Sequence, residues 1–273
     1  MTSIPDPSVV NFFMVGCPRC GTTWVHAALK DHPNVFLPAQ KQTYFYDVNY
    51  DKGLDWYLGN FSTVSPQHVA VGEIATGYSQ PHAIPRMARD FPHVRIMLAM
   101  RDPSDRAYSF YQSRAVNQGW RTIQEAIEEQ PEILEQGKYI EQIEQLLEHY
   151  DRDRMLLLFY EDLRDDDRAY LASILRFLGV DSEYESPQFG RMVQVAAFPK
   201  LRRLLYRMKM QPLVDWVSRH AIGDYIRRQI KNRNVRRYST MDAKTRKFLT
   251  DFYRPYNERL QAHTGRDLSH WMN

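Results

Sequence analysis

The chain has 273 residues, of which 43% are hydrophobic and 25% charged, and its formal net charge is +3. This composition is that of an ordinary globular protein, and two cysteines argue against a disulfide scaffold and fit a reducing compartment. No apolar run approaches the roughly 18 residues that span a bilayer, and residues 1–7 lack the basic cluster and apolar core of a secretory signal, so we expect a single domain in the cytoplasm.

A strand, a loop and a helix are predicted in succession near the N-terminus. Residues 11–15 form a short apolar run that ends at Gly16, Gly21 closes a tight turn, and residues 22–30 have the amphipathic pattern of a helix. In such an arrangement the backbone N–H groups of the loop converge and the helix dipole favours negative charge. The sequence therefore predicts an anion site of the phosphate-loop type.

The residues of this loop differ from those of the loops that bind nucleoside triphosphates. Gly16 and Gly21 have the spacing of the pattern G-x-x-x-x-G-K-[ST]. Thr22 and Thr23 stand where that pattern has its lysine and its hydroxyl residue, and the cation is Arg19 instead. An ATPase or kinase needs that lysine on the transferring phosphate and the hydroxyl on magnesium. The residues thus argue against such chemistry, and a nucleotide kinase is kept as an alternative.

Cys17 and Cys20 support a second interpretation of the same loop. They form a C-x-x-C pair between a strand and a helix, which is the position of the redox motif in thioredoxin-like folds. A helix N-terminus would lower the pKa of a thiol there, as a thiol oxidoreductase requires. The simpler alternative is that both cysteines are small packing residues. No spacing of His, Cys or carboxylate residues indicates a metal site.

Four more strands are predicted along the first two thirds of the chain. Apolar runs mark them at residues 35–37, 69–74, 94–101 and 155–159, with helical patterns at 81–91, after 102 and at 168–178. Strands that alternate with helices predict an α/β fold with a parallel central sheet and helices on both faces. Ligands of such sheets bind at the carboxyl ends of the strands. Gly16, Glu73 and Arg101 all lie at strand ends, so we expect them at one site.

The predicted domain has three parts. Residues 11–180 form the α/β core, which includes an acidic helical stretch at 122–150 with a solvated face. A basic segment follows at 198–240, and a closing helix at 241–264. The arginines and lysines of residues 200–237 can cover a doubly anionic cofactor and the acceptor site, or can contact an anionic membrane peripherally.

Arg101 and Ser109 make the resemblance to a known family specific. Arg101 ends a strand and Ser109 follows eight positions later in a predicted helix, so that both can bind one phosphate. This pair resembles the 3′-phosphate motif of the sulfotransferases that use 3′-phosphoadenosine 5′-phosphosulfate (PAPS), and the first loop resembles their 5′-phosphosulfate loop. The similarity extends over roughly residues 11–262 and implies the P-loop-like sulfotransferase fold.

The resemblance implies a cofactor site for PAPS and its product 3′-phosphoadenosine 5′-phosphate (PAP). The implied binding residues are Arg19, Cys20, Gly21, Thr22, Thr23, Trp24, Arg101, Ser109, Tyr160, Arg236 and Arg237. Arg19 would also be catalytic, because it would stabilise the charge on the leaving oxygen. The implied reaction moves a sulfuryl group, without a metal, to a hydroxyl or amine of a sugar, a lipid-linked acceptor or another small molecule. Nucleic acid is not an expected partner.

One position departs from the pattern of the heparan-sulfate type of sulfotransferase, which residues 51–57 and 85–88 resemble. In that type, the loop after the second strand carries a glutamate that acts as catalytic base. Gln42 stands at this position, and an amide cannot take a proton at neutral pH. Glu73 and Asp47 are the alternative bases, and we favour Glu73. Each also has a structural interpretation, Glu73 as an acceptor for backbone N–H groups and Asp47 as a turn or cap residue. The aromatic residues 44–46 would allow a sugar, a lipid-linked acceptor or a phenol.

Overall fold

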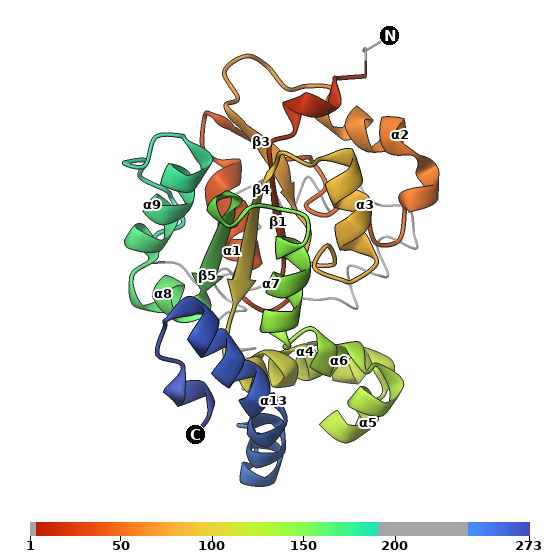
Figure 1. Ribbon diagram of the computed structural model, residues 1–273, viewed down its shortest axis with the longest axis vertical. Helices are drawn as coiled ribbons and strands as arrows, with labels where there is room; N and C mark the ends of the chain where they lie inside the picture. The colour runs from red at the N-terminus through yellow and green to blue at the C-terminus, as the bar shows by residue number, and fades with distance from the viewer. Residues whose placement is uncertain (1–3, 191–239) are drawn as a thin grey trace, which may run out of the picture. The chain divides into compact units, whose positions relative to one another are not determined.

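The computed structural model describes residues 4–190 and 240–273, and within them five strands form one parallel sheet (Figure 1). The strands are β1 (Phe12–Gly16), β2 (Val35–Phe36), β3 (Ala70–Ile74), β4 (Arg95–Met100) and β5 (Met155–Phe159). Their order across the sheet is β2-β3-β1-β4-β5. The predicted parallel sheet is thereby confirmed. Most of the basic segment predicted at 198–240, with Arg236 and Arg237, lies outside the described residues.

Strand β1 occupies the centre of the sheet. Phe12 is aligned with Gly72 of β3 on one side and with Arg95 of β4 on the other. Gly72 fits there because it has no side chain: a Cβ atom on it would lie 2.1 Å from the carbonyl oxygen of Phe12. The chain leaves β1 towards one edge of the sheet and leaves β3 towards the other. The carboxyl end of β1 therefore lies at the point where parallel sheets of this kind bind ligands.

Helices cover both faces of the sheet, as predicted (Figure 1). Right-handed crossovers put α1 (Thr22–Lys30) on one face and α3 (Ala83–Asp90) on the other. On the first face, α1 contacts α9 (Asp167–Leu178), where the rings of Trp24 and Tyr170 are 6.3 Å apart. On the second face, α7 (Tyr139–Leu147) lies near α3, and the Tyr150 hydroxyl that follows α7 donates to the carbonyl oxygen of Phe91.

The helix predicted after Arg101 is α4 (Pro103–Gln118), and Asp102 is its N-cap. The carboxylate of Asp102 accepts hydrogen bonds from the N–H groups of Ser104 and Asp105, and Pro103 occupies the first turn. The acidic stretch consists of three helices, α5 (Ile123–Glu129), α6 (Glu132–Glu135) and α7. Their apolar sides are buried and most of their glutamates are exposed.

The remaining helices are α2 (Leu54–Leu58), α8 (Tyr160–Asp165) and α13 (Ala243–Thr264), with 3₁₀ turns at Pro7–Val9, Tyr50–Lys52, Gly59–Phe61, Arg152–Arg154 and Ser269–Trp271. Helix α13, drawn in blue, packs against α4 and α7 (Figure 1). Its Tyr253 is buried and donates a hydrogen bond of 3.0 Å to the carbonyl oxygen of Leu134. None of the described helices is long and apolar enough to cross a membrane.

Candidate active site

The loop between β1 and α1 has the backbone of an anion site. Gly21 caps α1 with a φ of +83° and offers no side-chain cap, so the first N–H groups of the helix are left for a ligand. A Cβ atom on Gly21 would lie 2.7 Å from the Leu163 side chain, which excludes any larger residue. Arg19 also has a positive φ of +74°. Both residues thus follow a left-handed path that turns the loop back towards α1.

Arg19 joins this loop to helix α4. Its Nε atom donates to the hydroxyl of Ser109 at 3.0 Å. These two residues are 90 positions apart in the chain, and the sequence motifs assign them to opposite ends of the cofactor. The contact therefore brings the two predicted phosphate motifs into one site.

Arg101 and Tyr160 form the other side of the site. The guanidinium of Arg101 stacks over the Tyr160 ring at 4.9 Å from its centroid, and the same ring lies against Gly21. The backbone of Arg101 is fixed by α7, because the Tyr139 hydroxyl donates to its carbonyl oxygen at 2.9 Å. Asp105 is 3.7 Å from the Arg101 guanidinium. The guanidinium of Arg101 thus lies beside the loop, and groups from α4, α7 and α8 hold the residue in place.

The two cysteines are buried packing residues in the structure. Both thiols are free, and neither side chain reaches the surface. Burial raises the pKa of Cys17 well above its usual range and that of Cys20 to about 11. Cys17 donates to the Gln142 side-chain oxygen at 3.2 Å. A redox motif needs an accessible thiol with a lowered pKa, so the geometry contradicts the thiol-oxidoreductase alternative.

Arg106 is a residue near the loop that the sequence analysis missed. Its side chain is fully buried, donates to the Gln136 side-chain oxygen at 3.3 Å and to the carbonyl oxygen of Ile133, and lies close enough to Cys17 and Cys20 to favour their ionised forms. A buried guanidinium next to an anion site adds to the positive potential there. The available signal was an arginine one helical turn after the Asp102 cap, next to the apolar Ala107.

Trp24 lies away from the other predicted cofactor residues. Its ring packs between Tyr170 and Phe189, and its indole N–H donates to the carbonyl oxygen of Gln188 at 3.3 Å. The side chain is almost entirely buried. The structure therefore gives Trp24 a packing role on the α9 side of α1, in place of the cofactor contact that the resemblance implied.

The loop after β2 brings two polar side chains to the start of α1 and the end of β3. Lys41 donates from Nζ to the Thr23 hydroxyl at 3.0 Å. Gln42 accepts a hydrogen bond of 3.3 Å from the hydroxyl of Thr76, which follows β3. Gln42, at the base position of the family pattern, thus lies close to the loop between β1 and α1. Lys41 was not among the site residues predicted from the sequence.

Glu73 lies beneath this loop with no exposed surface. One carboxylate oxygen accepts from the backbone N–H of Thr43, and the other accepts from the Thr43 hydroxyl at 3.1 Å and from the Tyr78 hydroxyl at 3.0 Å. Burial raises the pKa of Glu73 to about 7, although these hydrogen bonds act in the opposite direction. The geometry favours the structural interpretation, in which Glu73 holds the loop to the sheet.

The three aromatic residues 44–46, which the sequence analysis considered for acceptor binding, differ in their exposure. Phe45 and Tyr46 are buried in an aromatic cluster, and Phe45 stacks on Tyr57 at 4.9 Å between ring centroids. Only Tyr44 is exposed, at 43%. Asp47 is partly exposed and contacts His82 at 3.3 Å, so its carboxylate is the accessible one of the two alternative bases.

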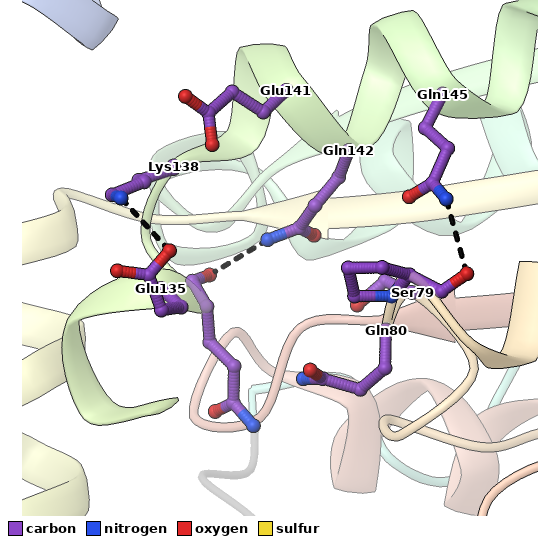
Figure 2. Close-up of a pocket in the computed structure, with 9 residues that line it drawn as sticks. Ser79, Gln80, Glu135, Lys138, Glu141, Gln142 and Gln145 are labelled. Carbon is purple, nitrogen blue, oxygen red and sulfur yellow. Dashed lines mark hydrogen bonds and ion pairs between the residues drawn. The ribbon is translucent and has the colours of Figure 1, made fainter. Parts of the chain in front are cut away.

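A small polar pocket of about 70 Å³ opens next to the loop (Figure 2). One wall is formed by residues 79–81 after β3, and the other by side chains of residues 135–145. Figure 2 shows Gln142 donating to the carbonyl oxygen of Gln136 and Gln145 donating to that of Pro81. Gln142 also accepts from Cys17, so the pocket adjoins the phosphosulfate loop. Its lining of amides and charged groups suits a hydrogen-bonding ligand.

No cluster of three or more His, Cys, Asp or Glu side chains that could hold a metal ion occurs in residues 4–190 or 240–273. The metal-independent reaction expected from the sequence stays a prediction.

Comparison with known proteins gives consistent matches over almost the whole chain. The family model described as "Sulfotransferase domain" matches residues 10–264. The bifunctional heparan sulfate N-deacetylase/N-sulfotransferase 2 of Homo sapiens is 26% identical over 288 residues, covering 96% of this chain and 30% of the relative. The corresponding enzyme 4 of Mus musculus is 25% identical, covering 96% and 31%. The chain thus spans about 30% of the length of these relatives.

A solved structure supports the fold. The crystal structure of a sulfotransferase from Alicyclobacillus acidocaldarius superimposes with a TM-score of 0.70 at 22% sequence identity, covering 97% of this chain and 99% of that chain.

Proposed function

The chain belongs to the sulfotransferase domain family, and from that premise we propose that it transfers the sulfuryl group of PAPS to a hydroxyl or amine of a sugar or other small acceptor. The observation that carries the proposal is the convergence of two cationic groups on one loop. Arg19 contacts Ser109, and Arg101 stacks on Tyr160 against Gly21. A ligand with two separate anionic groups and an aromatic base fits this set.

The described residues fit PAPS at both ends. The uncapped start of α1, with Cys20, Gly21, Thr22 and Thr23, suits the 5′-phosphosulfate. Arg101 and Ser109 suit the 3′-phosphate, and Tyr160 offers an aromatic face for adenine. Arg236 and Arg237 would complete the 3′-phosphate site, which stays a prediction from the sequence.

The cofactor supplies an activated sulfuryl group, whose bond to the 5′-phosphate oxygen breaks as the acceptor oxygen or nitrogen bonds to sulfur. In our proposal Arg19 leaves Ser109 and stabilises the charge that develops on the departing phosphate oxygen. The loop N–H groups and the hydroxyls of Thr22 and Thr23 orient the phosphosulfate. Stabilisation of the developing charge and positioning of the reacting groups make the largest contributions to the rate in group transfer of this kind.

The proton of the acceptor needs a destination other than Gln42. Glu73 is enclosed by Thr43 and Tyr78 and has no exposed oxygen, which favours a positioning role. Asp47, which is on the same loop as Gln42, is partly exposed. It is paired with His82, which directly precedes α3. We therefore propose Asp47 as the working base, with Gln42 as a hydrogen-bond partner of the acceptor.

The proposed acceptor is polar. The curated relatives carry names of enzymes that act on heparan sulfate. The pocket beside Gln142 is lined by amide and charged side chains that can form hydrogen bonds with hydroxyl and amine groups. A sugar is therefore the acceptor class that we favour. A cytoplasmic location, membrane contact through residues 200–237 and the absence of a nucleic-acid partner stay predictions from the sequence.

Calorimetric titration with PAP, ATP and magnesium tests this function. PAP should bind without magnesium, and ATP should bind more weakly because it has no 3′-phosphate for Arg101 and Ser109. Arg101→Ala should weaken PAP binding by roughly 10- to 100-fold, since a hydrogen bond to a charged group contributes about 1.5–3 kcal/mol.

Arg95→Ala is the matched control, because Arg95 begins the same strand that Arg101 follows, at the end away from the site. It should leave PAP affinity unchanged. Tight, magnesium-dependent binding of ATP together with weak binding of PAP would contradict the sulfotransferase assignment and favour a kinase.

A further inference from the structure

Lys41 presents a cation to the phosphosulfate loop from outside it. Its Nζ atom donates to the hydroxyl of Thr23 at 3.0 Å, and Thr23 is the second residue of α1. In the described part of the chain no carboxylate forms an ion pair with Lys41. The ammonium therefore lies at the edge of an anion site with no counter-ion from residues 4–190 or 240–273.

The surroundings of Lys41 are unfavourable for a charge in the ligand-free protein. Burial lowers the pKa of Lys41 to about 8. His26 is the titratable group that faces it from α1, and burial together with the charges of Lys41 and Lys30 lowers the pKa of His26 to about 4. Neither neighbour supplies negative charge. An anion bound in the loop would be the missing partner.

The loop itself is short of cations at its sulfuryl end. Thr22 stands where nucleoside-triphosphate loops have their lysine. Arg19, the loop's own cation, points to Ser109 on α4. Ile74, which follows Glu73 at the end of β3, is apolar and buried and therefore supplies no cation either. Among the described side chains, Lys41 is the cation that contacts the first turn of α1, through the Thr23 hydroxyl.

We propose that Lys41 binds the 5′-phosphosulfate end of the cofactor and donates a hydrogen bond to the sulfuryl group during transfer, replacing the lysine that the loop lacks. This inference rests on the proposed function. Lys41 keeps its proton throughout: the sulfur–oxygen bond breaks towards the 5′-phosphate, which keeps the electron pair, and the acceptor's proton goes to the base or to solvent. A nearby polyanion favours the ammonium form, which is why Lys41 acts as a donor and not as the base.

The proposal has a consequence for binding that does not depend on turnover. At pH 8.5 much of Lys41 is neutral in the free protein, and an anion beside it restores its charge. Binding of PAP should then take up roughly half a proton or more. The phosphates of PAP are fully ionised at this pH, so they contribute no proton exchange. Titrations in two buffers of different ionisation enthalpy measure the uptake directly.

Three variants test the assignment against a purely structural role for Lys41. Lys41→Met should abolish the proton uptake and weaken PAP binding about tenfold or more, whereas binding of adenosine 3′-monophosphate, which has no 5′ anion, should change less than about threefold. Lys41→Arg should restore most of the PAP affinity. Lys30→Met, which removes an exposed lysine at the other end of α1, should behave like the wild type in both titrations.

Each outcome decides a different claim. If the wild type binds PAP but takes up no proton at pH 8.5, or if Lys41→Met binds PAP as tightly as the wild type, the role of Lys41 is overturned and the proposed function stands. Equal losses of PAP and adenosine 3′-monophosphate binding in Lys41→Met would indicate a general disturbance and would also overturn it. If the wild type binds neither nucleotide, the proposed function itself fails and Lys41 with it.

Discussion

The role of a side chain at this site depends more on its hydrogen-bond partners than on its residue type. Glu73 and Asp47 are both carboxylates near Gln42, but Glu73 is enclosed by Thr43 and Tyr78, whereas Asp47 reaches the surface beside His82. A base must contact the acceptor. Accessibility therefore separates a positioning carboxylate from a candidate base, and it favours Asp47, whereas the sequence favoured Glu73.

Glu73→Gln should make the protein relatively more stable as pH rises. The unfolded carboxyl has its ordinary pKa of 4.5 and burial raises the pKa of the folded one to about 7. Between these values the unfolded state binds fewer protons, so the wild type loses stability as pH rises. The amide does not titrate. From pH 5 to pH 8 the free energy of unfolding of Glu73→Gln should gain up to roughly 3 kcal/mol relative to the wild type.

Urea unfolding at several pH values measures this difference. Glu148→Gln changes an exposed glutamate of the acidic stretch and should show no such gain. Parallel pH profiles for wild type and Glu73→Gln would mean that the hydrogen bonds to Thr43 and Tyr78 fully offset the burial of the charge.

Gln42→Glu should raise sulfuryl transfer if the acceptor lacks an efficient base. The carboxylate would stand beside Lys41 and Thr76 with nearly the volume of the amide. With Asp47 as the working base, we expect little change in rate. An increase of at least tenfold, with a new carboxylate limb in the pH–rate profile, would mean that the acceptor has no efficient base, since general-base assistance contributes about 10²- to 10⁴-fold. Transfer of ³⁵S from labelled PAPS to a panel of sugar acceptors is the measurement.

Gln67→Glu adds the same charge at an exposed position before β3, away from the site, and should leave the rate unchanged. No gain from Gln42→Glu would mean that Asp47 or another group already removes the proton.

At the scale of elements, the loop from Gly16 to Gly21 depends on backbone conformation and on its fit to α8. Gly21 has a φ of +83°, and the ring of Tyr160 and the side chain of Leu163 lie directly against it. Side chains are disfavoured at such a φ, and the contact with α8 leaves them no space. The anion site therefore requires the strand, the loop and α8 together.

Gly21→Ala should lower the melting temperature and remove PAP binding. The new methyl group would lie 2.7 Å from Leu163, so the loop or α8 must move. The left-handed conformation alone costs about 1–2 kcal/mol for a residue with a Cβ atom. Gly179→Ala is the control: its φ is +76° at the end of α9, but nothing lies within 4 Å of the added atom.

Gly179→Ala should show the conformational cost without loss of PAP affinity. Equal destabilisation and full PAP binding in both variants would show that the contact with Leu163 does not shape the loop.

At the scale of the whole molecule, helices remote in sequence complete the site. Tyr139 of α7 fixes the backbone of Arg101. Arg246 of α13 donates to the carboxylate of Asp102 at 3.2 Å and also to that of Asp105, the acidic neighbour of Arg101. These contacts span 38 and 144 residues of sequence. Arg101, the proposed ligand of the 3′-phosphate, is therefore held by elements that close the fold as a whole.

The sequence by itself determined the features that depend on local periodicity. The strand, loop and helix around Gly16 and Gly21 and the parallel α/β class were predicted and are confirmed. Hydrogen bonding and side-chain direction in a strand or helix repeat over a few residues, so a short stretch contains the needed information. Arg101 and Ser109 could be paired for the same reason, because the start of one helix separates them.

Only the tertiary structure decided which residues from separate segments meet. It packed Trp24 against α9, enclosed Glu73 under the loop, buried Phe45 and Tyr46, and brought Lys41 to Thr23. The last three of these outcomes depend on how the loop after β2 packs on the sheet and on α1. That packing minimises exposed apolar surface and unpaired polar groups over the entire core, and no pattern within the loop itself encodes it.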